Sequence, residues 1–196
     1  MSRPISVAVT GGIGAGKSEA LAAFAECGAA TVSSDEIVHH LLRHDQEVRA
    51  ALVAELGEGI LGDDGHIDRG RVADIVFRDR SKLDFLEAFL HPRVAAEYLR
   101  WREQLAELPN PPRVCVTEVP LLYESGGESR FDKVVVITAP AKLREQRRRV
   151  RRDDREERLL PDKEKVKRAD YAYVNTGTLE ELDAWVAGVM TELTAA

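Results

Sequence analysis

The sequence predicts an α/β fold of three layers, in which a parallel sheet is covered by helices on both faces. Two observations lead to this class. Short runs rich in Val and Ile alternate with longer helical patterns through most of the 196 residues, as expected where crossover helices join parallel strands. These runs are almost continuously apolar instead of alternating with polar residues, which is typical of strands buried on both faces.

The predicted elements follow in order along the chain. The expected strands are Ile5–Thr10, Ala30–Ser33, residues 113–119, Lys133–Thr138 and residues 171–175. The expected helices between and after them are residues 17–27, 141–152 and 179–193. A chain of this length suits one compact domain, with room for an inserted subdomain.

Residues 36–108 interrupt the alternation, because they hold no convincing strand. They are predicted to form several helices that break at Gly57, in the turn of residues 62–65 and at His91-Pro92. Apolar side chains recur at mostly helical spacing in residues 78–108, as the core positions of an amphipathic helix do. The predicted organisation is a core of residues 1–35 and 109–196 that carries an inserted helical subdomain of residues 36–108.

The charge of the chain is unevenly distributed. The sequence has 28 Lys and Arg against 34 Asp and Glu, a formal net charge of −6. Residues 142–168 hold 13 basic and 7 acidic side chains, a local charge of +6, so the remainder carries −12. A nucleic-acid-binding protein would usually be basic as a whole, whereas a local basic segment suits a small anionic ligand. We therefore expect small-molecule partners and no nucleic acid.

Two features bear on the location of the protein. No apolar run approaches the ~20 residues of a membrane-spanning helix, and the N-terminal run is too short for a signal peptide. Cys27 and Cys115 stand apart without a C-x-x-C spacing, which favours two buried, reduced thiols over a disulfide or a metal pair. These features predict a cytoplasmic protein with no membrane partner.

The clearest motif is a glycine-rich loop that stands between a predicted strand and a predicted helix. It matches G-x-x-x-x-G-K-[ST], the phosphate-binding loop of nucleoside triphosphatases and kinases. Glycines allow backbone N–H groups to turn toward phosphate oxygens, and the helix N-terminus adds partial positive charge. Lys17 can reach the β- and γ-phosphates, and the Ser18 hydroxyl can bind Mg²⁺. After Gly11, the expected nucleotide-binding residues are Gly12, Ile13, Gly14, Ala15, Gly16, Lys17 and Ser18.

The loop identifies a ligand but not a reaction. A GTPase would carry Asn-Lys-x-Asp, which the sequence lacks, and a larger motor would need a longer chain. A small kinase remains, and a kinase needs an acceptor pocket, a base and a lid. Asp35 follows the second predicted strand, at the sheet edge where ligands bind in open α/β sheets. Its carboxylate could receive or orient a hydroxyl proton, or it could cap a helix that begins at Glu36, and the residues alone leave both interpretations open.

Further residues, in order along the chain, resemble those of the dephospho-coenzyme A kinase family. After the loop and Asp35, the matching segments are Asp68-Arg69, Val76-Phe77, Leu86-Glu87, Leu90-His91-Pro92, Glu118-Val119-Pro120-Leu121-Leu122-Tyr123-Glu124, Ala169-Asp170 and Asn175-x-Gly177. The His-Pro and Pro-Leu-Leu-Tyr-Glu segments are the more specific ones, because many families share the loop. The resemblance covers about residues 5–193.

This resemblance implies ATP-dependent phosphorylation of the ribose 3′-hydroxyl of dephospho-coenzyme A, which is the last step of coenzyme A biosynthesis. It also implies a P-loop nucleotide kinase core, a helical coenzyme A-binding subdomain and a mobile lid. Asp35 takes the position of the family's base, which favours the catalytic interpretation. Glu118, His91 and Leu121 are expected to bind substrate, although Glu118 could instead cap a helix and His91 could be structural.

The arginine-rich segment is interpreted as the lid, over residues 142–165. Eight arginines lie from Arg144 to Arg158. On a helix, four of them would share one face, the arginine face: Arg144, Arg148, Arg152 and Arg155. Phosphoryl transfer spreads negative charge over oxygens that the arginine fork binds in pairs, so arginine suits a closing lid. Matched to the family, Arg148 and Arg152 are the expected catalytic arginines, beside Lys17 and Asp35.

The chain departs from the family pattern in five features. Ala15 stands where the loop commonly has Ser, Ser33 stands where Asp is common, and Glu118 replaces Asp. The lid is several residues short, and Leu159 stands where Gln is often found. Two alternatives to the main interpretation follow. One is a P-loop kinase that acts on another nucleoside or nucleotide, and the other is a nucleotide-dependent switch with no small-molecule acceptor.

Overall fold

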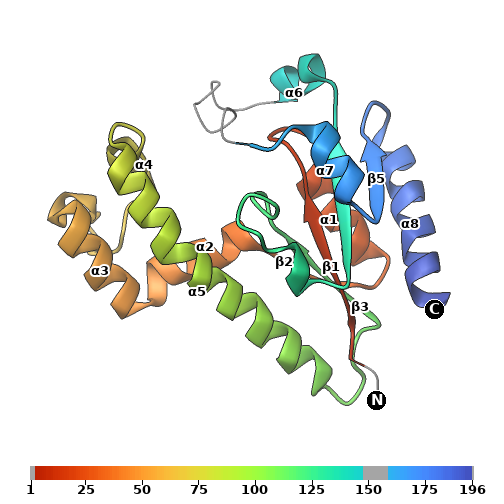
Figure 1. Ribbon diagram of the computed structural model, residues 1–196. Coiled ribbons are helices and arrows are strands. Elements are labelled where there is room, and N and C mark those ends of the chain that lie inside the picture. The colour runs from red at the N-terminus through yellow and green to blue at the C-terminus, as the bar shows by residue number, and fades with distance from the viewer. Residues whose placement is uncertain (1–2, 148–158, 196) are drawn as a thin grey trace. The chain divides into compact units, whose positions relative to one another are not determined.

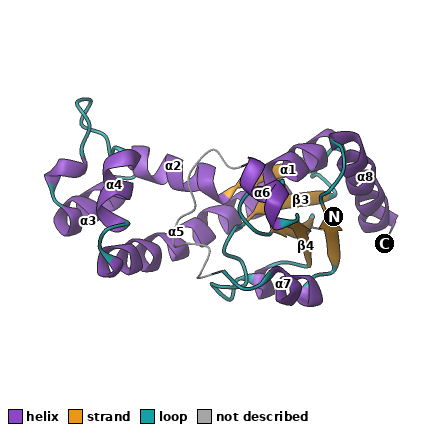
Figure 2. Cartoon of the chain, turned by 90° about the horizontal axis from the view of Figure 1, so that it is seen from above, coloured by secondary structure: helices purple, strands orange, loops and turns teal. Residues whose placement is uncertain are grey.

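A computed structural model describes residues 3–147 and 159–195. The chain divides into two compact units, the first made of Met1–Ser33 with Arg100–Ala196 and the second of Ser34–Leu99. Every strand that is described belongs to the first unit, whereas the second is helical apart from one isolated bridge between Leu61 and Ile67 (Figure 2). Along the sequence, the helical unit Ser34–Leu99 therefore stands between the first two strands of the sheet and the last three.

The first unit is built on a parallel sheet of five strands in the order β2-β3-β1-β4-β5 (Figure 1). The strands are β1 (Ile5–Thr10), β2 (Ala30–Ser33), β3 (Val114–Glu118), β4 (Lys133–Thr138) and β5 (Tyr171–Val174). Three have the predicted bounds, and β3 and β5 are shorter by one or two residues. Because β1 lies between β3 and β4, the chain leaves β1 at the middle of the sheet. The predicted α/β fold with a parallel sheet is confirmed.

Both faces of the sheet are buried, which explains the almost continuous apolar runs in the sequence. Successive side chains of β1 alternate between the faces, so Val7 and Val9 join one core while Ala8 joins the other. Helices α1 (Lys17–Glu26) and α8 (Leu179–Ala195) pack together over the first face. Leu160 and Ala169, which stand before and after α7 (Asp162–Arg168), pack against the core on the second face. Helix α6 (Ala141–Arg147) follows β4 along the chain.

The second unit contains α2 (Ser34–His44), α3 (Gln46–Leu56), a 3₁₀ turn (Glu58–Ile60), α4 (Arg69–Val76) and most of α5 (Arg80–Ala106). Asp45 and Asp68 are the N-caps of α3 and α4, and each carboxylate accepts two backbone N–H groups. Gly57 ends α3 with a φ of 87°, a conformation that suits glycine. The predicted breaks at Gly57 and at residues 62–65 are confirmed.

The predicted break at His91-Pro92 is wrong, because α5 runs unbroken through Pro92. Proline usually ends a helix, since it lacks a backbone donor and crowds the carbonyl one turn earlier. Here the Arg93 guanidinium donates to the Phe89 carbonyl at 3.0 Å and lies 3.7 Å from the centre of the Phe89 ring. The carbonyl that loses its backbone donor to Pro92 is that of Ala88, so the Arg93 contact lies one residue further along the same turn and does not replace the lost bond.

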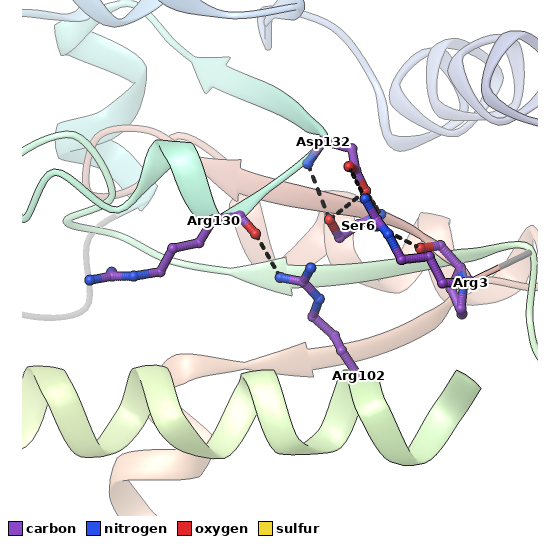
Figure 3. Close-up of polar contacts among 6 residues, drawn as sticks. Arg3, Ser6, Arg102, Arg130 and Asp132 are labelled. Carbon is purple, nitrogen blue, oxygen red and sulfur yellow. Dashed lines mark hydrogen bonds and ion pairs between the residues drawn. The ribbon is translucent and has the colours of Figure 1, made fainter. Parts of the chain in front are cut away.

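A polar network joins the start of β1 to the start of β4 (Figure 3). Arg3 donates to both carboxylate oxygens of Asp132 at 2.6 Å, and Asp132 also accepts the Ser6 backbone N–H at 2.9 Å and the Ser6 hydroxyl at 2.7 Å. The hydrogen bonds from Arg3 hold the pKa of Asp132 well below its usual range, helped by those from Ser6. This network lies at the amino ends of the strands, so it serves stability.

Two expectations about exposure have different outcomes. No helix within the described residues is long and apolar enough to cross a bilayer. Both cysteines are free, but only Cys115 is buried, and the expected burial of Cys27 is wrong. Helix α1 ends at Glu26 and the chain turns at Gly28, so Cys27 does not continue the buried stripe of that helix.

Candidate active site

The loop between β1 and α1 is packed so closely that two of its glycines cannot carry a side chain. Gly11 has a φ of 146°, and a Cβ there would lie 1.9 Å from the Ile137 carbonyl oxygen of β4. Gly16 has a φ of 100°, and its Cβ would lie 2.2 Å from Asn175 Nδ2, just after β5. The loop therefore lies directly against the carboxyl ends of β4 and β5, where it opens into α1.

Lys17 and Ser18 are the first two residues of α1. The Lys17 ammonium turns back and donates to the Gly12 carbonyl at 3.2 Å, while Ser18 and Ile13 are exposed. The first N–H groups of a helix have no partner within it, so α1 presents donors and partial positive charge at the loop. This geometry suits an anion such as a phosphate group.

Asn175 clamps the loop from the end of β5. It is 5% exposed, its Nδ2 donates to the Ala15 carbonyl at 3.0 Å, and its backbone N–H donates to the Thr138 carbonyl at 2.7 Å. Asn175 stands in one of the segments that resemble the family, but its sequence position predicted no role for it. An amide side chain directly after a strand, at the edge where the loop also lies, was the signal that could have identified it.

Two charged side chains from the segment after β4 lie on the loop. Arg144 of α6 and Asp162 of α7 form an ion pair, with 3.6 Å between Nη1 and Oδ2. A Cβ on Gly12 would come within 2.3 Å of Arg144 Nη1 and 3.5 Å of Asp162 Oδ1. Arg144 was predicted only as one member of the arginine face, and Asp162 was not predicted.

Glu118 ends β3 at the same edge of the sheet. It is 6% exposed, and the strand register pairs it with Val9 of β1 and Ser33 of β2.

The chain passes from Ser33 straight into α2, so Asp35 is an exposed residue of the first helical turn. The alternative in which Asp35 caps a helix that begins at Glu36 is therefore wrong, because the helix begins earlier. The role of Asp35 as a base stays a prediction.

The turn after β3 holds the chain on both sides of the start of α7. Leu121 is half-buried in this turn. Glu124, three residues later, accepts the Leu160 backbone N–H at 2.9 Å through Oε1. The same oxygen lies 2.8 Å from Nζ of Lys165, a lysine with no exposed side-chain surface. This buried ion pair was not predicted.

The remaining predicted residues lie elsewhere. His91 is an exposed residue of α5 in the second unit, and Arg148 and Arg152 lie outside the described residues. The described part of the first unit thus brings together the glycine loop, its lysine and serine, and, at the end of β3, Glu118. Within residues 3–147 and 159–195, no group of three or more His, Cys, Asp or Glu side chains could by itself hold a metal ion.

Comparison with known proteins gives one consistent result. Residues 5–181 match the family model for dephospho-CoA kinase. A dephospho-CoA kinase of Aquifex aeolicus is 36% identical over 194 residues, which cover 96% of this chain and 97% of that protein. One of Mesorhizobium japonicum is 38% identical over 200 aligned residues, 96% of each chain.

Solved structures agree with these sequence relatives. A crystal structure of a protein from Thermus thermophilus is 32% identical, with a TM-score of 0.77 over 98% of this chain and 99% of that one. The structure of a dephospho-CoA kinase from Campylobacter jejuni is 24% identical, with a TM-score of 0.69 over 98% of both chains. The second likeness concerns the fold alone.

Proposed function

The chain belongs to the dephospho-CoA kinase family, and on that premise we propose that it transfers the γ-phosphoryl group of ATP to the ribose 3′-hydroxyl of dephospho-coenzyme A. The products are coenzyme A and ADP. The observation that carries the proposal is the family match over residues 5–181, which include the glycine loop and the Pro-Leu-Leu-Tyr-Glu segment. Phosphotransferase activity is the property of the family, and the acceptor and the residue roles below are proposed for this chain.

The proposed reaction is an in-line displacement at the γ-phosphorus. The acceptor 3′-oxygen forms the new bond to phosphorus, the bond to the oxygen that bridges the β- and γ-phosphates breaks, and ADP leaves with that oxygen. The hydroxyl proton passes to the carboxylate of Asp35, which is exposed in the first turn of α2. Asp35 must therefore reach the acceptor hydroxyl in the reacting complex.

The loop supports this chemistry by holding the triphosphate. Its N–H groups and the N-terminus of α1 attract phosphate oxygens. The Lys17 ammonium donates to the Gly12 carbonyl, which places it at the loop where a phosphate oxygen would bind. A hydrogen bond from an ammonium to a charged phosphate oxygen is a strong one, so this position favours nucleotide binding.

Ser18 fits the Mg²⁺ ion that kinases of this class use. Mg²⁺ prefers oxygen ligands and is usually held by one or two protein groups together with substrate phosphates. The Ser18 hydroxyl is exposed beside Lys17 at the start of α1, where it could supply one such oxygen. When bound, Mg²⁺ would neutralise charge on the β- and γ-phosphates.

The remaining roles complete the proposal. Glu118 and Leu121 bind the acceptor from the end of β3, and His91 contacts it from α5. Arg148 and Arg152 neutralise the charge that develops on the transferring group. The partners are ATP and dephospho-coenzyme A, with neither nucleic acid nor a membrane, and the location is the cytoplasm.

Incubation with ATP, Mg²⁺ and dephospho-coenzyme A tests the acceptor. Mass spectrometry should show coenzyme A together with an equal amount of ADP. A panel of nucleosides and nucleotides in place of dephospho-coenzyme A identifies a kinase with a different acceptor. Slow ATP hydrolysis that dephospho-coenzyme A does not change, with no coenzyme A formed, would overturn the proposal in favour of a nucleotide-dependent switch.

The variant Asp35→Asn tests the proposed base. We expect kcat to fall by ~10²-fold or more with nearly unchanged ATP affinity, because the loss of a general base removes proton transfer and not binding. Glu36→Gln is the matched control, since Glu36 is the next exposed acidic residue of the same helical turn and should keep near-parental turnover. Near-parental turnover of Asp35→Asn would remove Asp35 from this role.

A further inference from the structure

We infer that Arg144 is a further phosphate-binding residue of the nucleotide site, and that Asp162 is the counter-ion that its guanidinium exchanges for the nucleotide. The inference rests on the proposed function only in that the loop binds a nucleoside triphosphate. The family resemblance points to other arginines, Arg148 and Arg152, as the catalytic ones. Arg144 is instead a described residue of α6, and its position carries the argument.

Arg144 packs on the loop with both its backbone and its side chain. Its Nη1 occupies the space that a Cβ on Gly12 would need, at 2.3 Å, and its carbonyl oxygen would lie 2.9 Å from a Cβ on Gly14. The Lys17 ammonium also lies at Gly12, 3.2 Å from its carbonyl oxygen. Two cationic groups from different helices therefore converge on the same residue of a phosphate loop.

The donors of Arg144 are incompletely used. Within the described residues, its guanidinium forms an ion pair with Asp162 at 3.6 Å, which is longer than a hydrogen bond. Its Nε is buried, and no described group accepts from it. Buried donors in folded proteins are nearly always paired, and a guanidinium carries five of them. An unpaired donor on a phosphate loop indicates that a ligand oxygen is the missing acceptor.

The position at Gly12 also indicates which phosphates are bound. The loop lysine reaches the β- and γ-phosphates in this motif, and Arg144 converges on the same residue as Lys17. A planar guanidinium can bind two phosphate oxygens at once, whereas its contact with the Asp162 carboxylate is an ion pair longer than a hydrogen bond. The Asp162 carboxylate competes with the triphosphate for Arg144 and also repels the triphosphate. Removal of the charge of Asp162 should therefore favour nucleotide binding.

Equilibrium binding of ATP, ADP and AMP to the full chain tests the inference. Arg144→Ala should raise the Kd for ATP by about 10- to 100-fold, as expected for the loss of charge-assisted hydrogen bonds. The rise should be smaller for ADP and small for AMP. Arg144→Lys keeps the charge without the fork and should recover part of the affinity. Lys142→Ala removes an exposed charge from the same helix as a control, and should change the Kd less than about threefold.

Asp162→Asn distinguishes a ligand-binding arginine from a structural cross-link. If Arg144 binds phosphate, this variant should bind ATP as tightly as the parent or severalfold more tightly. If the pair only joins α6 to α7, Asp162→Asn should weaken ATP binding as much as Arg144→Ala does, or all three nucleotides should lose affinity equally, and either result overturns the inference.

Two measures keep the test decisive. Thermal unfolding shows whether Arg144→Ala folds, and if it does not, Arg144→Lys and Asp162→Asn give the answer in its place. Binding is measured without dephospho-coenzyme A. A wrong acceptor assignment would therefore leave the effect of Arg144 on ATP binding in place, and the two failures are distinguishable.

Discussion

Breaking the buried ion pair between Glu124 and Lys165 should strongly destabilise the first unit. Nζ of Lys165 lies 2.8 Å from Oε1 of Glu124, and the lysine side chain has no exposed surface, whereas that of Glu124 is 14% exposed. No described group accepts a well-aligned hydrogen bond from the ammonium, so the carboxylate balances it by charge. The perturbations are Glu124→Gln, Lys165→Met and the double variant.

The two single changes should differ in cost because the two partners differ in burial. Glu124→Gln leaves a fully buried ammonium without its counter-charge, and we expect a loss of about 3–5 kcal/mol of unfolding free energy. Lys165→Met leaves a carboxylate that reaches solvent and still accepts the Leu160 N–H at 2.9 Å, so its cost should lie at the lower end of that range. The double variant buries no unpaired charge and should cost about 2 kcal/mol less than the sum.

Urea unfolding of the parent, the single variants and the double variant measures these terms as a double-mutant cycle. Thermal midpoints should fall by roughly 2–4 °C for each kcal/mol lost. Lys163→Met is the control, because Lys163 is exposed on the same helix and should change stability little. Costs that add within about 0.5 kcal/mol, or a larger cost for Lys165→Met than for Glu124→Gln, would refute the reasoning.

Two more predictions follow from hydrogen bonds described above. Asp132→Asn should destabilise the protein near neutral pH, because the lowered pKa of Asp132 makes the ionised carboxylate stabilising. The difference in unfolding free energy between the parent and the variant should shrink as the pH falls below about 3.8. An equal difference in urea unfolding at pH 6 and pH 3 would contradict this. Asn175→Ala removes the Nδ2 donor of the Ala15 carbonyl and should cost about 1–3 kcal/mol while weakening ATP binding, which unfolding and ATP titration measure. Asn175→Asp, whose carboxylate cannot donate, should lose as much stability and ATP affinity as Asn175→Ala. Parental stability and ATP affinity in Asn175→Asp would argue against a role for the hydrogen bond to the Ala15 carbonyl.

The parts of the fold that local pattern specifies were predictable. A strand buried on both faces is apolar at most of its positions, so β1 and β4 are visible in the sequence with their bounds. The glycine loop was equally visible, because Gly11 and Gly16 meet neighbouring backbone and side-chain atoms that exclude any Cβ.

The parts that depend on distant partners were not predictable. Pro92 stands inside α5 although it removes the N–H donor for the Ala88 carbonyl, so a local rule that proline ends a helix predicts a break where the helix continues. Lys165 lies in the polar sequence of α7, which predicts an exposed side chain, whereas in the fold it is buried against Glu124 from the turn after β3. Asn175 likewise acquires its contact when β5 takes its place in the sheet.

The division of the chain at Ser33 and Arg100 also separates its natural spectroscopic probes. Both tryptophans, Trp101 and Trp185, belong to the first unit, so tryptophan fluorescence reports on that unit. All five histidines belong to Ser34–Leu99, at positions His39, His40, His44, His66 and His91, so imidazole proton resonances report on the helical unit. Denaturation followed by the two signals therefore measures, without any label, whether the insert and its host melt as one cooperative block or one after the other.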